Sequence, residues 1–167
     1  MNRPERLVLL LLLVLGAAQL GWYQPRLPEP MASSFGFDGA PSSWSSRDAF
    51  LWTHALTTGL SAGLFLLLAW VLPRSPVRMM NIPHPEYWLA PERRAATLAR
   101  VSVQLLRFGC VLMVFLLWTF QLTILANLSD PIRLPQAPFW ASFAAFTGYS
   151  VWWTLRLVLG FNRVPRD

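Results

Sequence analysis

The sequence predicts an all-α polytopic membrane protein: a bundle of four transmembrane helices with an ordered outer loop and a long third helix extending into the cytoplasm. Three observations predict this fold. The 167-residue chain is 54% hydrophobic but only 13% charged, about half the roughly 25% typical of a soluble domain. Its apolar residues gather into four long blocks, and its arginines cluster beside those blocks. At this length we expect one membrane domain, residues 1–167.

The four blocks are expected to be helices, because lipid leaves no backbone group unpaired and the blocks lack the strict alternation of barrel strands. Each approaches or exceeds the roughly 20 residues that cross a hydrocarbon core. The first block also fits a signal peptide, with Gly16 and Ala18 before a cut, so cleavage stays an alternative. The predicted spans are about 7–23, 49–72, 101–128 and 139–161, with an outer loop at 24–48 and an inner loop at 73–100.

Arginine counts set the predicted orientation, because cytoplasmic segments carry an excess of Lys and Arg. The two chain ends and the inner loop hold nine arginines, whereas the two outer loops hold three. We therefore expect both termini and the inner loop to be cytoplasmic. The net charge of +6 follows this distribution, so membrane lipids rather than nucleic acid are the expected partners. The nine are Arg3, Arg6, Arg74, Arg78, Arg93, Arg94, Arg100, Arg163 and Arg166.

The outer loop, QPRLPEPMASSFGFDGAPSSWSSRD, is expected to be an ordered cap. Three prolines in its first seven residues forbid a continuing helix, and Asp38-Gly39 is a turn signal. Ser45 followed by Asp48 has capping-box spacing and is expected to start the second span. A compact cap and a contact site for a ligand or toxin are both open interpretations. The candidate contact residues are Ser34, Phe35, Asp38, Gly39 and Trp44.

The inner loop contains NIPHPEYWLAPERRAA, residues 81–96, which suits either a water-facing hinge or a protein-docking surface. A catalytic role is the least favoured interpretation. Pro91 suits the first turn of a helix, and no helix breaker follows it. We expect one helix from Pro91 to about residue 128, about 57 Å long, that projects into the cytoplasm. The candidate docking residues are Tyr87, Trp88, Glu92, Arg93 and Arg94.

A basic stripe is predicted on that long helix. Arg93, Arg100 and Arg107 are seven residues apart and so lie on one helical face that descends into the membrane. Arg156, near the end of the fourth span, is expected at the same cytoplasmic edge, where a long side chain reaches water. Anionic lipid headgroups are the expected partners of these arginines.

Polar residues inside the spans are expected to join helices by hydrogen bonds. His54 and Thr58 share a face of the second span, and Gln121 lies at a similar depth on the third. A proton or ion path along these residues is the alternative. Gly59 and Gly63 have a spacing that allows close helix approach. The two histidines of the chain fall on opposite sides of the predicted topology, so we expect no metal site, no cofactor and no enzymatic activity.

Two loop segments carry a family resemblance. LPEPMASSFGFDGAPSSWSSRDAF and NIPHPEYWLAPERRAAT, with the spacing of the four spans, resemble a bacterial integral-membrane family of unknown function. Its domain is also similar to the N-terminal part of immunity proteins against a sporulation-delay toxin. Members often carry histidine where this chain has Ser34, which puts any ligand of that histidine in doubt here. The resemblance implies residence in the bacterial cytoplasmic (inner) membrane and an immunity or signalling role.

The expected function is therefore that of a non-enzymatic integral membrane protein that binds a protein partner, in an immunity, signalling or assembly role. The alternative is a small transporter or channel component with a polar path between helices two and three. A homo-oligomer is compatible with both hypotheses.

Overall fold

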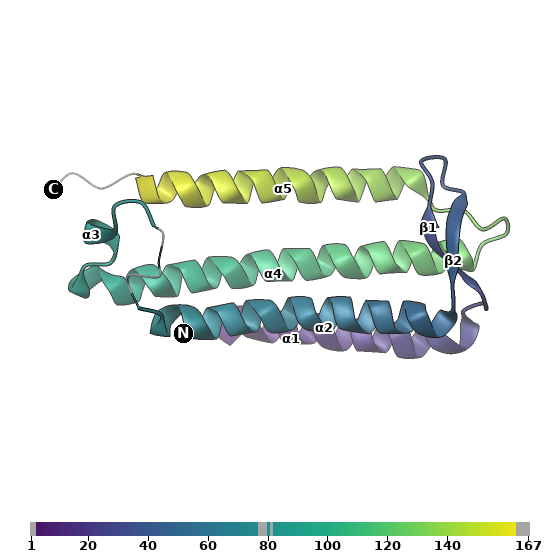
Figure 1. Cartoon of the computed structure of the whole chain (residues 1–167), viewed down its shortest axis with the longest axis horizontal. Helices are drawn as coiled ribbons and strands as arrows, with labels where there is room; N and C mark the ends of the chain where they lie inside the picture. The colour runs from purple at the N-terminus through teal and green to yellow at the C-terminus, as the bar shows by residue number, and fades with distance from the viewer. Residues whose placement is uncertain (1–2, 77–79, 81, 163–167) are drawn as a thin grey trace.

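A computed structural model describes residues 3–76, 80 and 82–162 and is mostly helical, at 77%. Its long helices run along one axis, and α1 begins at the end of the bundle where α5 stops (Figure 1). We call this the terminal end, and the opposite end, which carries a β-hairpin, the hairpin end. The long helices are α1 (Arg3–Tyr23), α2 (Arg47–Val71), α4 (Pro91–Asn127) and α5 (Gln136–Asn162). The short elements are η1 (Gln24–Arg26), β1 (Met31–Phe35), β2 (Pro41–Ser45), η2 (Leu72–Arg74) and α3 (Pro85–Trp88).

Three of the described helices are long and apolar enough to cross a membrane. They are Pro4–Arg26, Arg47–Arg74 and Pro91–Asn127. The first three blocks are thus confirmed as helices that are long and apolar enough to span a membrane, and the long helix does begin at Pro91. That α5 is a fourth span, and that α4 extends into the cytoplasm, stay predictions. The predicted orientation rests partly on Arg78, Arg163 and Arg166, which lie outside the described residues.

Helices α1, α2 and α4 form a three-helix core. Leu9 of α1, Phe65 of α2 and Met113 of α4 are buried in one hydrophobic cluster. Gly109 lets α2 and α4 approach closely, because a Cβ atom there would lie 2.6 Å from the Phe65 ring. Gly16 does the same for α1 and α4, since its Cβ would lie 2.9 Å from a methyl group of Leu117.

The close contact expected at Gly59 and Gly63 does not occur. A Cβ atom at either position would have no neighbour within 4 Å. Gly59 and Gly63 therefore lie on a face of α2 that does not pack against the other helices that the structure describes. The buried face of α2 passes instead through larger residues, which are Phe50, His54, Thr58, Ala62, Phe65 and Ala69.

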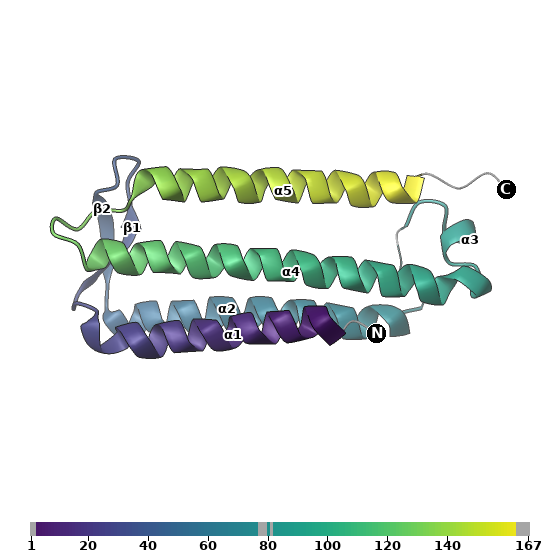
Figure 2. The same ribbon diagram turned by 180° about the vertical axis from the view of Figure 1, so that it is seen from behind.

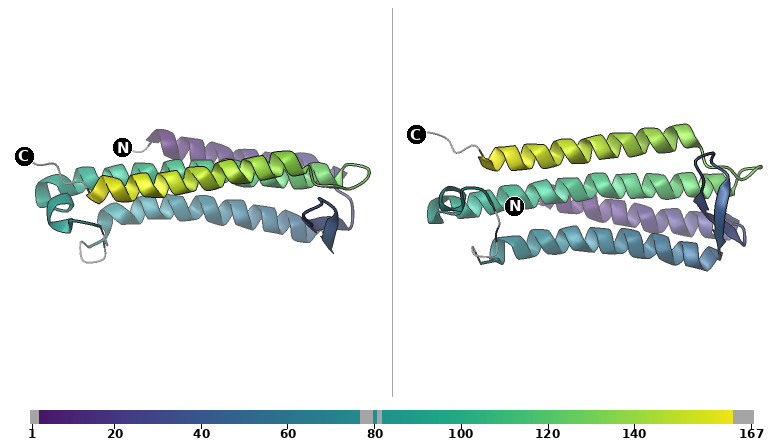
Figure 3. Two further views of the ribbon diagram at one scale, coloured as in Figure 1. Left: turned by 90° about the horizontal axis from the view of Figure 1, so that it is seen from above. Right: turned by 45° about the horizontal axis from the view of Figure 1, so that its top comes forward.

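Helix α5 packs on the side of α4 away from α1 and α2 (Figures 1 and 2). Aromatic rings make this interface: Phe115 stacks on Phe146 with centroids 4.5 Å apart, and Phe108 lies 4.7 Å from Trp153. No described residue of α5 is buried. The two further views agree that α5 is attached along one side of the bundle (Figure 3).

The hairpin was not predicted as strands. β1 and β2 pair antiparallel, and Met31 is fully buried against Phe50 and Ile124. Ser46, not Ser45, caps α2, because its side chain accepts a bond from the Ala49 N–H at 3.1 Å. The expected cap at Ser45 is wrong by one residue, since strand pairing with Met31 keeps Ser45 extended.

Candidate functional site

The buried side chain of Asn127 fastens the hairpin to the end of α4. Its Oδ1 accepts a bond from the Ala32 N–H at 2.7 Å, and its Nδ2 donates to the Ala32 carbonyl at 3.0 Å. A further bond to the Thr123 carbonyl at 2.9 Å orients the amide. One side chain therefore pairs both backbone groups of Ala32, which would otherwise be buried without partners. Sequence reasoning missed this residue, whose only signal is a polar amide ending an apolar helix.

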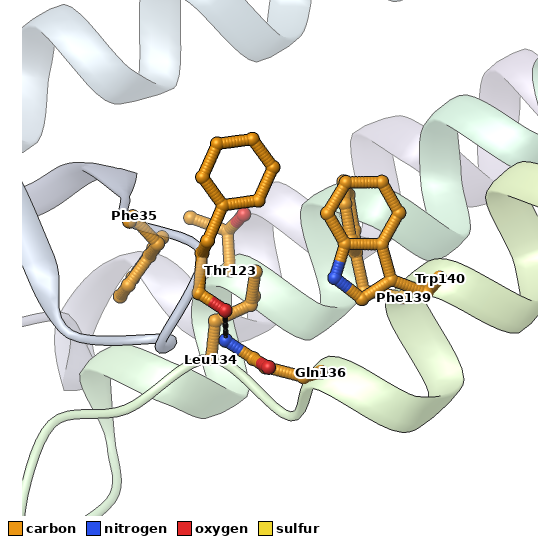
Figure 4. A pocket seen from close by; sticks show the side chains of 8 residues that line it. Phe35, Thr123, Leu134, Gln136, Phe139 and Trp140 are labelled. Carbon is orange, nitrogen blue, oxygen red and sulfur yellow. Dashed lines mark hydrogen bonds between the residues drawn. The ribbon is translucent and has the colours of Figure 1, made fainter.

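The hairpin turn rests on the connection between α4 and α5. Asp38-Gly39 forms the turn as expected, with Gly39 at a φ of +78°. The Leu134 N–H donates to the Gly39 carbonyl at 2.9 Å, and a Cβ atom on Gly39 would lie 2.7 Å from the Leu134 carbonyl oxygen. Both the positive φ and the close approach therefore require glycine. The Gln136 side chain also donates to the Phe37 carbonyl (Figure 4).

A hollow of about 390 Å³ lies between the hairpin, the end of α4 and the start of α5 (Figure 4). We call it the hairpin hollow. Phe37 and Trp140 stack across it with parallel rings, 5.9 Å between centroids. Phe37 is nevertheless 86% exposed, so the rim of the hollow is open to its surroundings. The hollow is lined by Phe35, Gly36, Phe37, Thr123, Leu134, Gln136, Phe139 and Trp140.

The five outer-loop candidates all lie on the hairpin, but they do different things. Phe35 lines the hollow, and Asp38 and Gly39 build the turn beside it. Ser34 is exposed on β1, with its Oγ 2.7 Å and 2.6 Å from the hydroxyl oxygens of Ser42 and Ser43. Trp44 is exposed on β2. Phe139 and Trp140 of α5 complete the hollow, whereas the sequence indicated only that they lie at the outer membrane interface of the fourth span.

A polar network joins the three core helices near the hairpin end. His54 is fully buried, and its Nε2 lies 2.9 Å from Oε1 of Gln19. Gln19 donates to Gln121 at 2.8 Å, and Gln121 donates to the Tyr23 hydroxyl at 3.0 Å. Thr58 turns back to the carbonyl of His54 on its own helix. Gln19 of α1, which the sequence analysis did not single out, therefore bridges the residues expected to pair α2 with α4.

This network borders a groove between α1 and α4. The groove has a volume of about 490 Å³. Gln19, Tyr23 and Gln121 line one part of it, and the remaining lining is apolar. A polar path between α2 and α4, as in the transporter hypothesis, stays a prediction.

The inner-loop candidates contact the protein itself at the terminal end. Trp88 donates from Nε1 to the Phe161 carbonyl at 2.8 Å, and its ring packs edge-on against Phe161. Arg94 donates to the Ser75 carbonyl at 2.8 Å. Arg93 lies over the Tyr87 ring, 4.1 Å from its centroid. Glu92 is exposed in the first turn of α4. These contacts connect the segments around η2, α3, α4 and α5 at the terminal end.

The four arginines expected at lipid headgroups have different surroundings. Arg107 pairs with Glu5 of α1 at 3.2 Å, Arg93 lies over the Tyr87 ring, and Arg156 lies over the Trp152 ring, 5.1 Å from its centroid. Arg100 and Arg156 line one small cleft between α4 and α5. Among the residues that the structure describes, no acidic group pairs with either of them.

Within residues 3–76, 80 and 82–162, no group of three or more His, Cys, Asp or Glu side chains is placed to hold a metal ion. A comparison of the chain with protein-family models, curated proteins and solved structures found no match. Its function is therefore argued from geometry.

Proposed function

We propose that this chain is a non-enzymatic multi-pass protein of the bacterial cytoplasmic membrane that binds a protein partner through the hairpin hollow, in an immunity, signalling or assembly role. In this proposal α5 is the fourth span, the hairpin end faces outward and both termini are cytoplasmic. The observation that carries it is an open apolar hollow built on a hairpin that the bundle holds in place.

The support for a binding role begins with preorganisation. Asn127 fixes the hairpin at its base, and the Gly39–Leu134 bond fixes its tip. The two chain segments that flank the hairpin are also joined, because Glu29 accepts a bond from the Arg47 N–H at 2.8 Å. A surface already ordered before binding loses less conformational entropy when a partner arrives. Such fixation is what a recognition site needs and what a merely connecting loop does not.

Exposed aromatic residues favour the hairpin end over the terminal end as the docking surface. Phe37 in the hollow and Trp44 on β2 are 86% and 52% exposed, and aromatic residues are enriched at protein interfaces. At the terminal end, Trp88 is already engaged by Phe161. The arginine distribution supports the orientation, and the resemblance of the two loop segments supports an immunity-type role.

A partner experiment tests the hollow. Tagged wild-type protein is extracted mildly from its native membrane and its co-purifying proteins are quantified, beside Phe37→Ala/Trp140→Ala and the matched control Trp52→Ala. Trp52 is 67% exposed on α2 and is not among the residues that line the hollow. We expect a stoichiometric protein that is retained by wild type and control but lost from the double variant. A partner lost only from Tyr87→Ala/Trp88→Ala/Arg94→Ala would place docking at the terminal end instead.

An accessibility experiment tests the orientation independently. In a Cys110→Ala background, Ser43→Cys and Glu92→Cys place single thiols at the hairpin end and the terminal end, where both parent residues are exposed. A membrane-impermeant maleimide added to intact cells should label position 43 and leave position 92 unlabelled. The reverse pattern would overturn the orientation, whatever the partner experiment shows.

A further inference from the structure

Arg100 and Arg156 are two of the arginines expected at lipid headgroups, and both line one cleft between α4 and α5 together with Trp88 and Gln104. Among the described residues no acidic side chain pairs with either of them, whereas Arg107 pairs with Glu5. Arg156 lies over the Trp152 ring, 5.1 Å from its centroid, as Arg93 lies over the Tyr87 ring, and such a contact leaves the positive charge without a counter-ion. Two neighbouring cations repel each other, and an anion bound between them removes that repulsion, so the pair suits a negatively charged ligand.

The helix register places the Cα atoms of the two arginines close enough along the helix axis for both side chains to reach one anion. The helices are antiparallel, with Phe115 opposite Phe146 and Phe108 opposite Trp153. The same register sets Arg156 opposite about residue 105, so its Cα lies roughly 7 Å along the axis from that of Arg100. Two long side chains can converge across that distance on a single phosphodiester.

The small size of the cleft favours a lipid headgroup over a soluble anion. Its volume is only about 20 Å³, so a soluble metabolite has no enclosed space to occupy. A headgroup that rests across the mouth of the cleft needs no such space, because its acyl chains anchor it in the bilayer. Val151 and Leu155, which are 55% exposed, offer apolar surface farther along α5 towards the middle of the bundle.

We propose that Arg100 and Arg156 bind the phosphodiester of an anionic phospholipid, which clamps the end of α5 onto α4. Gln104 supplies an amide donor, and the Trp88 indole closes the terminal side of the site. The clamp compensates for an interface in which no described α5 residue is buried. This inference rests on the proposed membrane position of the terminal end, but it is independent of the hairpin hollow.

The binding test counts lipids retained by the purified full-length protein in native mass spectrometry. The protein is titrated with phosphatidylglycerol, cardiolipin or phosphatidylcholine, and in a separate arm with inorganic phosphate. The test variant is Arg100→Gln/Arg156→Gln. The charge-matched control is Arg74→Gln/Arg93→Gln, because both residues lie at the same end and neither is among the residues that line the cleft.

We expect wild type and control to retain at least one of the two anionic lipids about tenfold more strongly than phosphatidylcholine, and the test variant to lose that preference. Arg100→Lys/Arg156→Lys should keep most of it, which excludes misfolding as the cause of the loss. Equal retention of all lipids by wild type, an equal loss in test and control variants, or full competition by inorganic phosphate would overturn the proposal.

A distance measurement tests the clamp itself. Spin labels at Ala96→Cys and Thr154→Cys, both exposed positions on α4 and α5, report the separation of the helices in a Cys110→Ala background. We expect a narrow distance distribution in phosphatidylglycerol nanodiscs and a broader one in phosphatidylcholine nanodiscs. An unchanged distribution would reject the clamp. If the lipid preference is found but no protein partner is lost from Phe37→Ala/Trp140→Ala, only the proposed function is rejected.

Discussion

The two faces of α4 are packed in different ways. Towards α1 and α2 the helices approach at Gly16 and Gly109, and fully buried side chains such as Leu106 and Met113 fill the interface. Towards α5 the contact consists of ring pairs, with no described α5 residue buried. In lipid there is little hydrophobic drive between helices, so close packing and hydrogen bonds decide which helices stay together. The difference indicates that α1, α2 and α4 form the more tightly packed core, and it predicts that α5 is the helix whose position a bound molecule would change.

The largest expected effect comes from filling the closest contact of the core. Gly109→Val would push a side chain into Phe65, whose ring lies 2.6 Å from the added Cβ position. We expect the free energy of unfolding to fall by about 3 kcal/mol, the upper part of the usual range for overpacking. The measurement is reversible unfolding in mixed detergent micelles, followed by circular dichroism.

The matched control for that substitution is Gly148→Val on α5. A Cβ atom there has no neighbour within 4 Å, and valine should change the unfolding midpoint little. Equal destabilisation by both substitutions would mean that the loss comes from placing valine in a helix and not from the contact with Phe65, and the evidence for a tightly packed α2–α4 contact would fail.

A smaller effect is expected at the polar network of the core. Gln19→Leu removes the bridge between His54 and Gln121 and leaves their polar atoms short of partners. Interhelical hydrogen bonds in membranes are worth about 0.6 to 1.7 kcal/mol, so we expect a loss of about 1.5 kcal/mol. Gln24→Leu, at an exposed residue in η1, is the control. No loss from Gln19→Leu would show that the core depends on shape alone.

On the α5 side, Phe146→Ala should separate one helix without unfolding the rest. The Phe115–Phe146 stack is worth about 1 kcal/mol, and its loss should broaden the α4–α5 distance distribution while the unfolding midpoint of the core shifts little. Phe143→Ala is the control, because the ring contacts of Phe143 are with Phe139 and Trp140 of its own helix. A cooperative loss of the whole fold would show that α5 belongs to the core.

The sequence predicted the long helices because hydropathy and length are local properties of the chain. It missed the elements that depend on distant partners. Ala32 and Asn127 are 95 residues apart, and Gln19 and Gln121 are 102 apart. The five-residue strands are rich in serine and carry little strand signal, so their pairing with each other and the docking of β1 onto α4 define them. The aromatic half of the hairpin hollow went unrecognised for the same reason, since Trp140 meets Phe37 only in the folded chain.

The smallest expected effect concerns the ion pair at the edge of the core. Glu5 is largely covered, whereas the Arg107 side chain is 66% exposed, and their separation is 3.2 Å. If this level lies among hydrated headgroups, Glu5→Gln should cost about 0.5 kcal/mol or less and the difference should vanish at high salt. Glu92→Gln, which alters an exposed acid farther along α4, is the control. A loss greater than that of Gln19→Leu, insensitive to salt, would instead place Arg107 below the headgroups. Arg100 and Arg156 would then lie nearer the hydrocarbon boundary, where an uncompensated charge costs more and an anionic lipid is bound more tightly.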